Sequence, residues 1–331
     1  MTVREFEAAY PARHSAAAIH IKRRELRDLG VAVKHAGIGR TPDPIDVHLP
    51  ELPPDASDEE LWSAYDAMQA VTRQHAESMA MPEADVAIAT DRPVGIVFMS
   101  DFHLGNAGTD TVQLREDVAL INTCDRLRVY VGGDGIDNFV IPALANAHRD
   151  GSLVTLEMQY LLFKSIIRQL LPNLLAVGTG NHDAWTRKMA GVEALLYGLR
   201  DVPVLHTKED TYLNLTVGRE KYTIFRKHRP PRSTMLNEGH GVQHQFRYGE
   251  RPFDVGVMEH HHVPHISTFF GHGEMRWAVR TGSYKIKDAF AREFGFYNSR
   301  PGTPVMVLFP YRKAIVPFMS VADAIDFLDV N

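Results

Sequence analysis

The chain has 331 residues and 44% of them are hydrophobic, which is enough for a sizeable core and exceeds the usual size of one domain. A formal net charge of -5 gives no overall attraction to nucleic acid, and no apolar stretch approaches the roughly eighteen residues of a membrane span. Cys124 is the only cysteine, which excludes thiolate metal sites. Because residues 1–15 lack the apolar core of a signal peptide, we expect a cytoplasmic protein with no membrane partner.

The N-terminal residues are basic. Residues 1–40 contain eight Lys or Arg against four acidic residues. Residues 16–29 and 31–36 would form two short helices around Gly30, a helix-turn-helix-like pattern that would bring a nuclease to DNA. The alternative is a solvated charged face, which is the usual role of a charge cluster on a helix. Nucleic acid binding by this arm is therefore a hypothesis.

The next segment is acidic, with twelve acidic residues and only Arg73 as a cation in residues 41–91. Prolines in residues 42–54 predict an extended linker. Ser57 and Glu60 match a capping box, which predicts a helix that begins there and packs on the rest of the protein. The expected organisation is a basic helical arm (1–40), a Pro-rich linker and acidic helix (41–91), and a main domain (92–331).

Five apolar runs in the main domain each lead into side chains of the kind that bind metals. Runs of this length are typical of buried strands. The runs are residues 94–99, 127–131, 174–177, 222–225 and 255–258, and they lead to Asp101-Phe102-His103, Gly133-Asp134 with Asp137, Gly180-Asn181-His182-Asp183, Lys227-His228 and His260-His261-His262.

Helical patterns lie between these runs, at residues 111–124 after an N-cap at Asp110 and at residues 153–171. Alternating strands and helices predict an α/β fold whose binding loops gather at the carboxyl ends of the strands. The five polar groups would therefore meet in one crevice. Carboxylate, imidazole and amide ligands suit divalent ions such as Mn, Fe, Zn or Ni.

The ordered series D-x-H, G-D-x-x-D, G-N-H-D, H and H-x-H, followed by Thr281-Gly282-Ser283, resembles the calcineurin-like metallophosphoesterases from about Val94 to Phe318. A single D-x-H is common by chance, whereas the whole series in order, each part after a strand, is specific. The resemblance implies two mixed β-sheets packed face to face and flanked by helices, here with a mainly helical N-terminal extension. Residues 92–331 would then be a metallophosphoesterase catalytic domain.

The resemblance also implies two divalent metal ions, Mn first and Fe, Zn or Ni as alternatives. One ion would be held by Asp101, His103 and His262, the other by Asn181, His228 and His260, and Asp134 would bridge them. Two such ions, roughly 3.5 to 4 Å apart, provide a bridging hydroxide for in-line attack on phosphorus.

His182 matches the general acid of the family, and Asp137 would orient its imidazole and favour the protonated form. Neither residue is expected to be a ligand. Asn181, His182 and Arg229 are the residues expected to bind substrate.

Three positions depart from the family pattern. Glu259 stands where the family has glycine, and it is either a solvated carboxylate at a strand end or an acceptor behind a metal-bound histidine. Arg229 also replaces a glycine and is either exposed or a phosphate clamp. Asn138 replaces the arginine of the serine/threonine protein phosphatases, which argues against that subfamily. The Thr281-Gly282-Ser283 turn is expected to be structural.

Other histidines are assigned by alternation and context. On an extended segment His260 and His262 share one side and His261 the other, and the family spacing selects the first two as ligands. His265 and His272 either line the substrate entrance or are surface residues. His240 and His244 are predicted to lie in a loop.

The function expected from these patterns is a phosphodiesterase or nuclease acting on a phosphoester substrate. A phosphomonoesterase on a nucleotide or small molecule is the close alternative. A non-catalytic scaffold with the same fold is a third possibility, although all the expected ligands are present.

Overall fold

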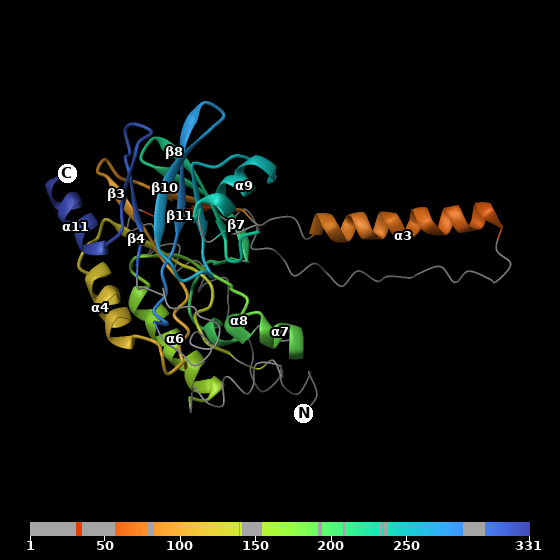
Figure 1. The fold of residues 1–331 in the computed structure, drawn as a ribbon, viewed down its shortest axis with the longest axis horizontal. Coiled ribbons are helices and arrows are strands. Elements are labelled where there is room, and N and C mark those ends of the chain that lie inside the picture. The colour runs from red at the N-terminus through yellow and green to blue at the C-terminus, as the bar shows by residue number, and fades with distance from the viewer. Residues whose placement is uncertain are drawn as a thin grey trace.

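A computed structural model describes residues 31–34, 57–78, 83–138, 140, 154–190, 194–207, 209–231, 234, 237–286 and 302–331. In these ranges the chain forms two mixed β-sheets with helices on their outer sides (Figure 1). The expected fold class is confirmed.

The larger sheet contains seven strands in the order β1-β2-β7-β8-β9-β11-β10. They are β1 (Val31–Lys34), β2 (Glu83–Ile88), β7 (Asp210–Val217), β8 (Glu220–Lys227), β9 (Val255–Met258), β10 (His265–Gly271) and β11 (Glu274–Arg280). β8 and β9 are parallel neighbours, so their carboxyl ends lie at the same edge.

The smaller sheet contains six strands in the order β13-β12-β3-β4-β5-β6. They are β3 (Val94–Met99), β4 (Leu127–Val131), β5 (Leu174–Gly178), β6 (His206–Thr207), β12 (Val305–Leu308) and β13 (Ile315–Phe318). β3, β4, β5 and β6 are successive parallel neighbours. The ends of β3, β4 and β5 therefore face the same way.

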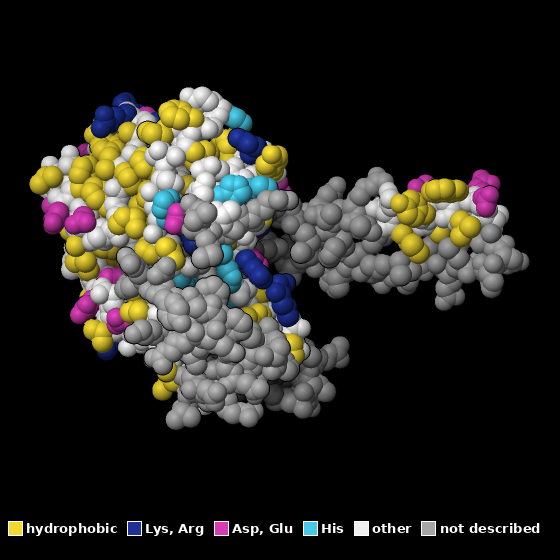
Figure 2. All heavy atoms as spheres, in the orientation of Figure 1, with side chains coloured by type: hydrophobic (Ala, Val, Ile, Leu, Met, Phe, Trp, Pro, Cys, Tyr) yellow, Lys and Arg dark blue, Asp and Glu magenta, His cyan; other side chains and the backbone are white. Residues whose placement is uncertain are grey.

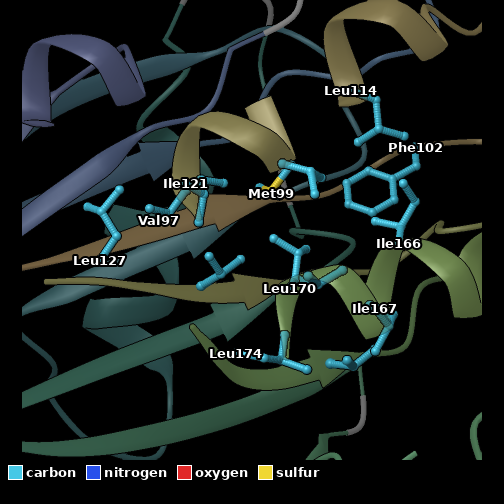
Figure 3. Packing of buried hydrophobic residues seen from close by; sticks show 14 of the residues in the cluster. Val97, Met99, Phe102, Leu114, Ile121, Leu127, Ile166, Ile167, Leu170 and Leu174 are labelled. Atoms are coloured by element: carbon cyan, nitrogen blue, oxygen red, sulfur yellow. The ribbon is translucent and has the colours of Figure 1, made fainter. Parts of the chain in front are cut away.

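Helices cover the outer face of the six-stranded sheet. They are α4 (Thr111–Ile121), α6 (Leu156–Leu170), α8 (Ala194–Leu199) and α11 (Val321–Val330). Leu114 of α4, Ile167 of α6 and Leu328 of α11 pack with Val97 and Val129 in one apolar cluster, part of which Figure 3 shows. α9 (His240–Tyr248) covers the other sheet through Val242 and Phe246.

A second apolar cluster lies between the two sheets. Ile96 and Phe98 of β3 pack there with Leu213 and Val257 of the other sheet. Because β3 is buried on both faces, its sequence is continuously apolar rather than alternating. This explains why short apolar runs located the strands so closely. The predicted runs 94–99, 127–131 and 255–258 coincide with β3, β4 and β9.

Both predicted helices of the main domain are present, although α4 ends at Ile121 rather than at residue 124 and α6 is shorter than predicted. The carboxylate of Asp110 accepts hydrogen bonds from the backbone N–H groups of Val112 and Gln113 and caps α4. α6 falls within the predicted residues 153–171.

The N-terminal region differs from expectation. Ser57 and Glu60 form the predicted capping box at the start of α3 (Asp58–Ser78). α3 lies apart from the sheets in Figure 1, and Leu61, Trp62 and Tyr65 are exposed, so the prediction that it packs on the main domain is wrong.

The predicted second helix of the basic arm is also wrong. Residues 31–34 form β1, which pairs with β2, and this excludes the helix-turn-helix-like pattern as drawn. The alternating Val-Ala-Val in β1 suits a strand that adds to an open sheet edge. The predicted helix at residues 16–29 lies outside the described residues. β2 was not predicted. It lies before residue 92, the predicted start of the main domain, yet it pairs with β7 of that domain.

Candidate metal centre

The five ligand-bearing loops meet because of strand direction. Asp101, Asp134 and Asn181 follow the carboxyl ends of three parallel strands, and His228 and His260 follow the ends of two parallel strands in the facing sheet. The backbone N–H groups of Asp101 and His103 donate to the carbonyls of Gly133 and Asp134, at 2.9 and 3.0 Å, so the first two loops continue the pairing beyond the sheet.

Five of the predicted ligands have a left-handed backbone. The φ angles are 54° at Asp101, 46° at His103, 56° at Asp134, 74° at His260 and 58° at His262. Residues other than glycine are strained in this conformation, and such residues persist where the surrounding structure holds them, typically at functional sites. Their concentration in the loops after β3, β4 and β9, at strand ends of the two sheets, identifies this region as a candidate site.

The first predicted ligand group is assembled. His262 Nε2 lies 3.3 Å from Asp101 Oδ1 and 3.1 Å from His103 Nε2. Asp101 and His103 are buried, and His262 is partly exposed. Three potential donor atoms thus converge on one point, as expected for one metal ion.

The second predicted group is assembled beside it. His228 Nε2 lies 3.1 Å from both Asp134 Oδ2 and Asn181 Oδ1, and His260 completes a cluster with Asp134 and His228. Asp134 Oδ2 is also 4.0 Å from His103 Nε2, so its carboxylate faces both groups. In the part of the chain that the structure describes, His261 belongs to no such cluster, in agreement with the predicted alternation.

The donor atoms fit divalent cations. Asp101 Oδ1 and Asp134 Oδ2 are buried and have no hydrogen-bond partner, a costly state that a cation would relieve. Burial, with the nearby Lys285 cation, lowers the pKa of His103 to about 3, and burial with the charge of His228 lowers the pKa of His260 to about 4. Neutral imidazoles are the form that binds metals.

The carboxyl groups are held ionised. Burial alone would raise the pKa of Asp134, but the positive charges of His228 and His182 outweigh it and bring the pKa well below the usual range. The pKa of Asp137 falls to about 2 because hydrogen bonding from His103 and the charge of Lys285 outweigh its burial. Anionic oxygens are therefore available at the centre.

Asp137 contacts His182 differently from the prediction. Its carboxylate accepts from His103 Nδ1 at 3.1 Å and from the Asn106 side-chain amide at 2.9 Å, whereas its backbone carbonyl accepts from His182 Nδ1 at 2.6 Å. The carboxylate thus orients a predicted metal ligand. Burial lowers the pKa of His182 despite the opposing charges of Asp134 and Asp137, so a shift toward the protonated form is not seen.

His182 is nevertheless firmly placed. Its ring stacks on the Trp185 indole with centroids 3.9 Å apart, and its Nε2 lies 3.9 Å from Asp134 Oδ2. Because a carbonyl oxygen only accepts, Nδ1 carries a proton and Nε2 is the atom that faces the cluster.

Glu259 is not a solvated carboxylate. It is 1% exposed, and its Oε2 accepts from His228 Nδ1 at 2.8 Å. The alternative interpretation, an acceptor behind a candidate metal-binding histidine, agrees with this geometry. Arg229 is exposed, beside the buried His228.

The Thr281-Gly282-Ser283 turn makes contacts that agree with the predicted structural role. The Ser283 hydroxyl donates to the carbonyl of Asp101 at 2.8 Å, and Thr281 and Ser100 hydroxyls lie 2.6 Å apart. These contacts hold the strained loop that carries Asp101.

The structure also places the four other histidines that the sequence singled out. His240 and His244 lie on α9 and not in a loop, because the apolar residues of that helix pack on the sheet. His265 begins β10 and His272 follows its end; His272 is exposed and His265 partly exposed, in agreement with the interpretation as surface residues.

Several site residues were missed in the sequence. Arg226 is buried on the face of β8 that also carries Tyr222 and Ile224. Because alternate residues of a strand share one face, the sequence could have shown that this arginine points toward the core. Lys285, whose Nζ lies 3.6 Å from Asp137 Oδ1, and Asn106 had no local signal. Asp183 was part of the predicted motif but had no predicted role; its Oδ2 accepts from the N–H groups of Gly180 and Asp134, at 2.8 and 2.7 Å, and so connects two loops.

No family model and no curated protein matches the chain. Solved structures that this chain resembles in backbone path include the calcineurin-like phosphoesterase YfkN from Bacillus subtilis. The sequence identity is 11% and the TM-score 0.39, and the match covers 71% of this chain and 92% of that one. Vps29 from Entamoeba histolytica complexed with zinc has 12% identity and a TM-score of 0.33 over 68% and 97%. The nuclease MPE from Pseudomonas putida has 13% identity and a TM-score of 0.30 over 67% and 87%.

Because these TM-scores are all below 0.5, function is inferred from the geometry of the site alone. Among the described helices none combines the length and apolar character needed to cross a bilayer.

Proposed function

We propose that the chain is a metal-dependent phosphoester hydrolase with two divalent ions. Asp101, His103 and His262 would hold one ion, Asn181, His228 and His260 the other, and Asp134 would contact both. The observation that carries this proposal is the pair of buried carboxylate oxygens, on Asp101 and Asp134, that lack a hydrogen-bond partner while imidazole nitrogens converge on them.

Two bound cations would acidify water, orient the phosphate and offset the charge that develops during in-line displacement. The protein side chains supply orientation. The carboxylates of Asp137 and Glu259 accept from the Nδ1 atoms of His103 and His228, which directs both Nε2 atoms into the centre.

His182 is proposed to move the proton. With Nδ1 bound to the Asp137 carbonyl, Nε2 is the atom that can give a proton to the leaving alkoxide. Stacking on Trp185 keeps the ring in this plane. Asn181, His182 and Arg229 are proposed to bind the substrate.

A phosphodiester, including a nucleic acid, is the proposed substrate class. Asn138 is 1% exposed, and its side chain donates to the His182 carbonyl at 2.6 Å and accepts from Thr186, so this position does not offer a cation to a phosphomonoester. Arg187 and Lys188 are exposed on α7 (Trp185–Ala190), close in sequence to His182. Figure 2 shows His side chains beside Lys and Arg side chains near the middle of one face, as suits an anionic ester. We propose Mn as the metal.

The first experiment is hydrolysis of bis-p-nitrophenyl phosphate and p-nitrophenyl phosphate by metal-stripped protein, with and without added Mn²⁺. We expect turnover of the diester that requires the metal and is absent in Asp134→Ala. Turnover of the monoester alone would replace the diesterase proposal by a phosphomonoesterase. Failure to bind any Mn²⁺ would contradict the proposed centre itself.

A further inference from the structure

Behind the proposed second ion lies a buried ion pair, Glu259 with Arg226. We propose that this pair is a positioning device: it fixes the orientation of His228 and ties together four of the ligand-bearing loops. The inference rests on the proposed function, because it assigns the pair a part in holding the metal centre.

Every oxygen of the Glu259 carboxylate is occupied. Oε1 accepts from Arg226 Nε at 2.7 Å, and Oε2 accepts from the Arg226 Nη2 group, from His228 Nδ1 at 2.8 Å and from the backbone N–H of Gly133 at 2.8 Å. Glu259 is 1% and Arg226 0% exposed. A carboxylate with this many partners has one position only.

The bond to His228 decides which nitrogen is offered to the centre. Because a carboxylate only accepts, Nδ1 of His228 donates to Glu259, and Nε2 is the nitrogen that would offer its lone pair to a bound cation. That Nε2 is the atom 3.1 Å from Asp134 Oδ2 and Asn181 Oδ1. Such a partner orients the ring and raises its basicity, and its mutation typically lowers metal affinity by about 10- to 100-fold.

Arg226 extends the connection to another loop. Its Nη1 donates to the carbonyl of Thr179, just ahead of Asn181, at 3.0 Å, and to that of Glu209 at 2.9 Å. The pair therefore links the loops after β4, β5, β8 and β9, which belong to both sheets. The described contacts of Asp137, in comparison, stay with His103, Asn106, Lys285 and His182.

Two glycines leave room for the pair. A Cβ on Gly132 would collide with Glu259 Oε1, and a Cβ on Gly178 would lie 2.9 Å from Arg226 Cζ and 2.5 Å from the Tyr130 hydroxyl. Both positions are too crowded for any side chain. The strand ends at these positions are thus adapted to the two buried charges.

Stability alone is a poor reason for such a pair. A protein with well-packed apolar residues in place of a buried ion pair is often equally stable or more stable, whereas removal of one partner is strongly destabilising because it leaves an uncompensated buried charge. Apart from the bond to the Glu209 carbonyl, the hydrogen bonds that the pair makes beyond itself go to His228, Gly133 and Thr179, in or beside ligand-bearing loops, and the positions that it fixes explain it better.

The test compares two double variants of equal charge and similar volume. The first combines Arg226→Met with Glu259→Met, and the second combines Arg226→Met with Glu259→Gln. Neither leaves a lone buried charge, and only the second keeps an oxygen that accepts from His228. Mn²⁺ binding to the stripped proteins is measured by calorimetry, together with the melting temperature of each stripped protein.

We expect wild type to bind two Mn²⁺ ions. The double variant with Glu259→Met should bind one of them about 10- to 100-fold more weakly, and the double variant with Glu259→Gln should recover to within about threefold of wild type. The two stripped variants should melt within a few degrees of one another.

Equal Mn²⁺ affinities in all three proteins, with lowered melting temperatures in the variants, would overturn the positioning role in favour of a structural one. Equal losses in both variants would overturn the part assigned to the His228 hydrogen bond. If wild type bound no Mn²⁺, the proposed centre would fail, and that result is distinct from either outcome among the variants.

Discussion

In both halves of the candidate metal centre a carboxylate accepts a hydrogen bond from Nδ1 of a ligand histidine, but the carboxylates come from different parts of the chain. In the half that contains Asp101, the ligand histidine is His103 and its Nδ1 is held by Asp137, from the loop that also carries Asp134. In the half that contains Asn181, the ligand histidine is His228 and its Nδ1 is held by Glu259, which directly follows β9, the next strand of the sheet.

The surroundings of the two carboxylates also differ. Asp137 is accompanied by the Asn106 amide and by Lys285 at 3.6 Å, while Glu259 is bound in two places by the fully buried Arg226. The comparison teaches that one orienting function can come from a local motif or from contacts across a sheet. Only the first kind leaves a recognisable spacing in the sequence.

Asp134 belongs to both halves, so its loss should have the largest effect. We expect Asp134→Asn to lower the turnover of a diester by at least about 10³-fold, because it weakens both ions, which together contribute several kcal/mol to the transition state. Metal analysis should show fewer than two bound Mn²⁺. Asp110→Asn is the control, since Asn also caps a helix and Asp110 lies outside the centre. A variant with two tightly bound ions and full turnover would refute the shared role of Asp134.

His182 Nε2 lies 3.9 Å from Asp134 Oδ2, and His182 is proposed to act on the leaving group. We expect His182→Asn to keep both ions while turnover of an unactivated diester falls by about 10²- to 10⁴-fold, the usual contribution of a general acid. The loss should be smaller with a p-nitrophenyl ester, because p-nitrophenolate hardly needs a proton. Equal losses on the two substrates, measured side by side, would argue against proton donation.

Asp137→Asn tests the first half by itself. We expect about a 10-fold loss in affinity for one Mn²⁺, the lower end of the usual range, because the amide oxygen of Asn still accepts from His103. Calorimetric titration of the stripped variant should show the second ion unchanged. The result distinguishes the halves if the ion weakened here differs from the one weakened by removal of Glu259. Weakening of the same ion in both cases would contradict the assignment.

Trp185 should give the smallest effect. Its indole stacks on His182, and an aromatic pair of this kind contributes about 0.5 to 1.5 kcal/mol, which corresponds to roughly a 2- to 10-fold change. We expect Trp185→Leu to lower kcat by that factor with little change in KM, and Trp185→Phe to restore most of it. An unchanged kcat in the Leu variant would show that the Asp137 carbonyl alone orients the ring.

Local sequence patterns predicted the positions of several strands and of the start of α4. β3, β4 and β9 appear at the predicted residues because continuous burial demands an uninterrupted apolar run. Asp110 caps α4 because a carboxylate satisfies N–H groups only two and three residues away. The candidate ligands could be found for the same reason: each directly follows a strand whose position was already known.

The tertiary structure alone decided the rest. The left-handed backbone at Asp101, His103 and Asp134 is sustained by contacts with distant residues such as Ser283, and residues other than glycine give no local sign of it. The exposure of α3, the strand at residues 31–34 and the helix that carries His240 depended on which apolar surface was available to each segment.

The sequence by itself determined where the polar groups stand along the chain, because a strand and the residue that follows it are set by local periodicity. Only the folded structure decided what each group touches. Asp137 lies against His103, and Glu259 lies between Arg226 and His228, because strand order and register bring together residues that are far apart in the chain. Burial then makes each of those contacts obligatory, since an unpaired charge between the sheets would be too costly.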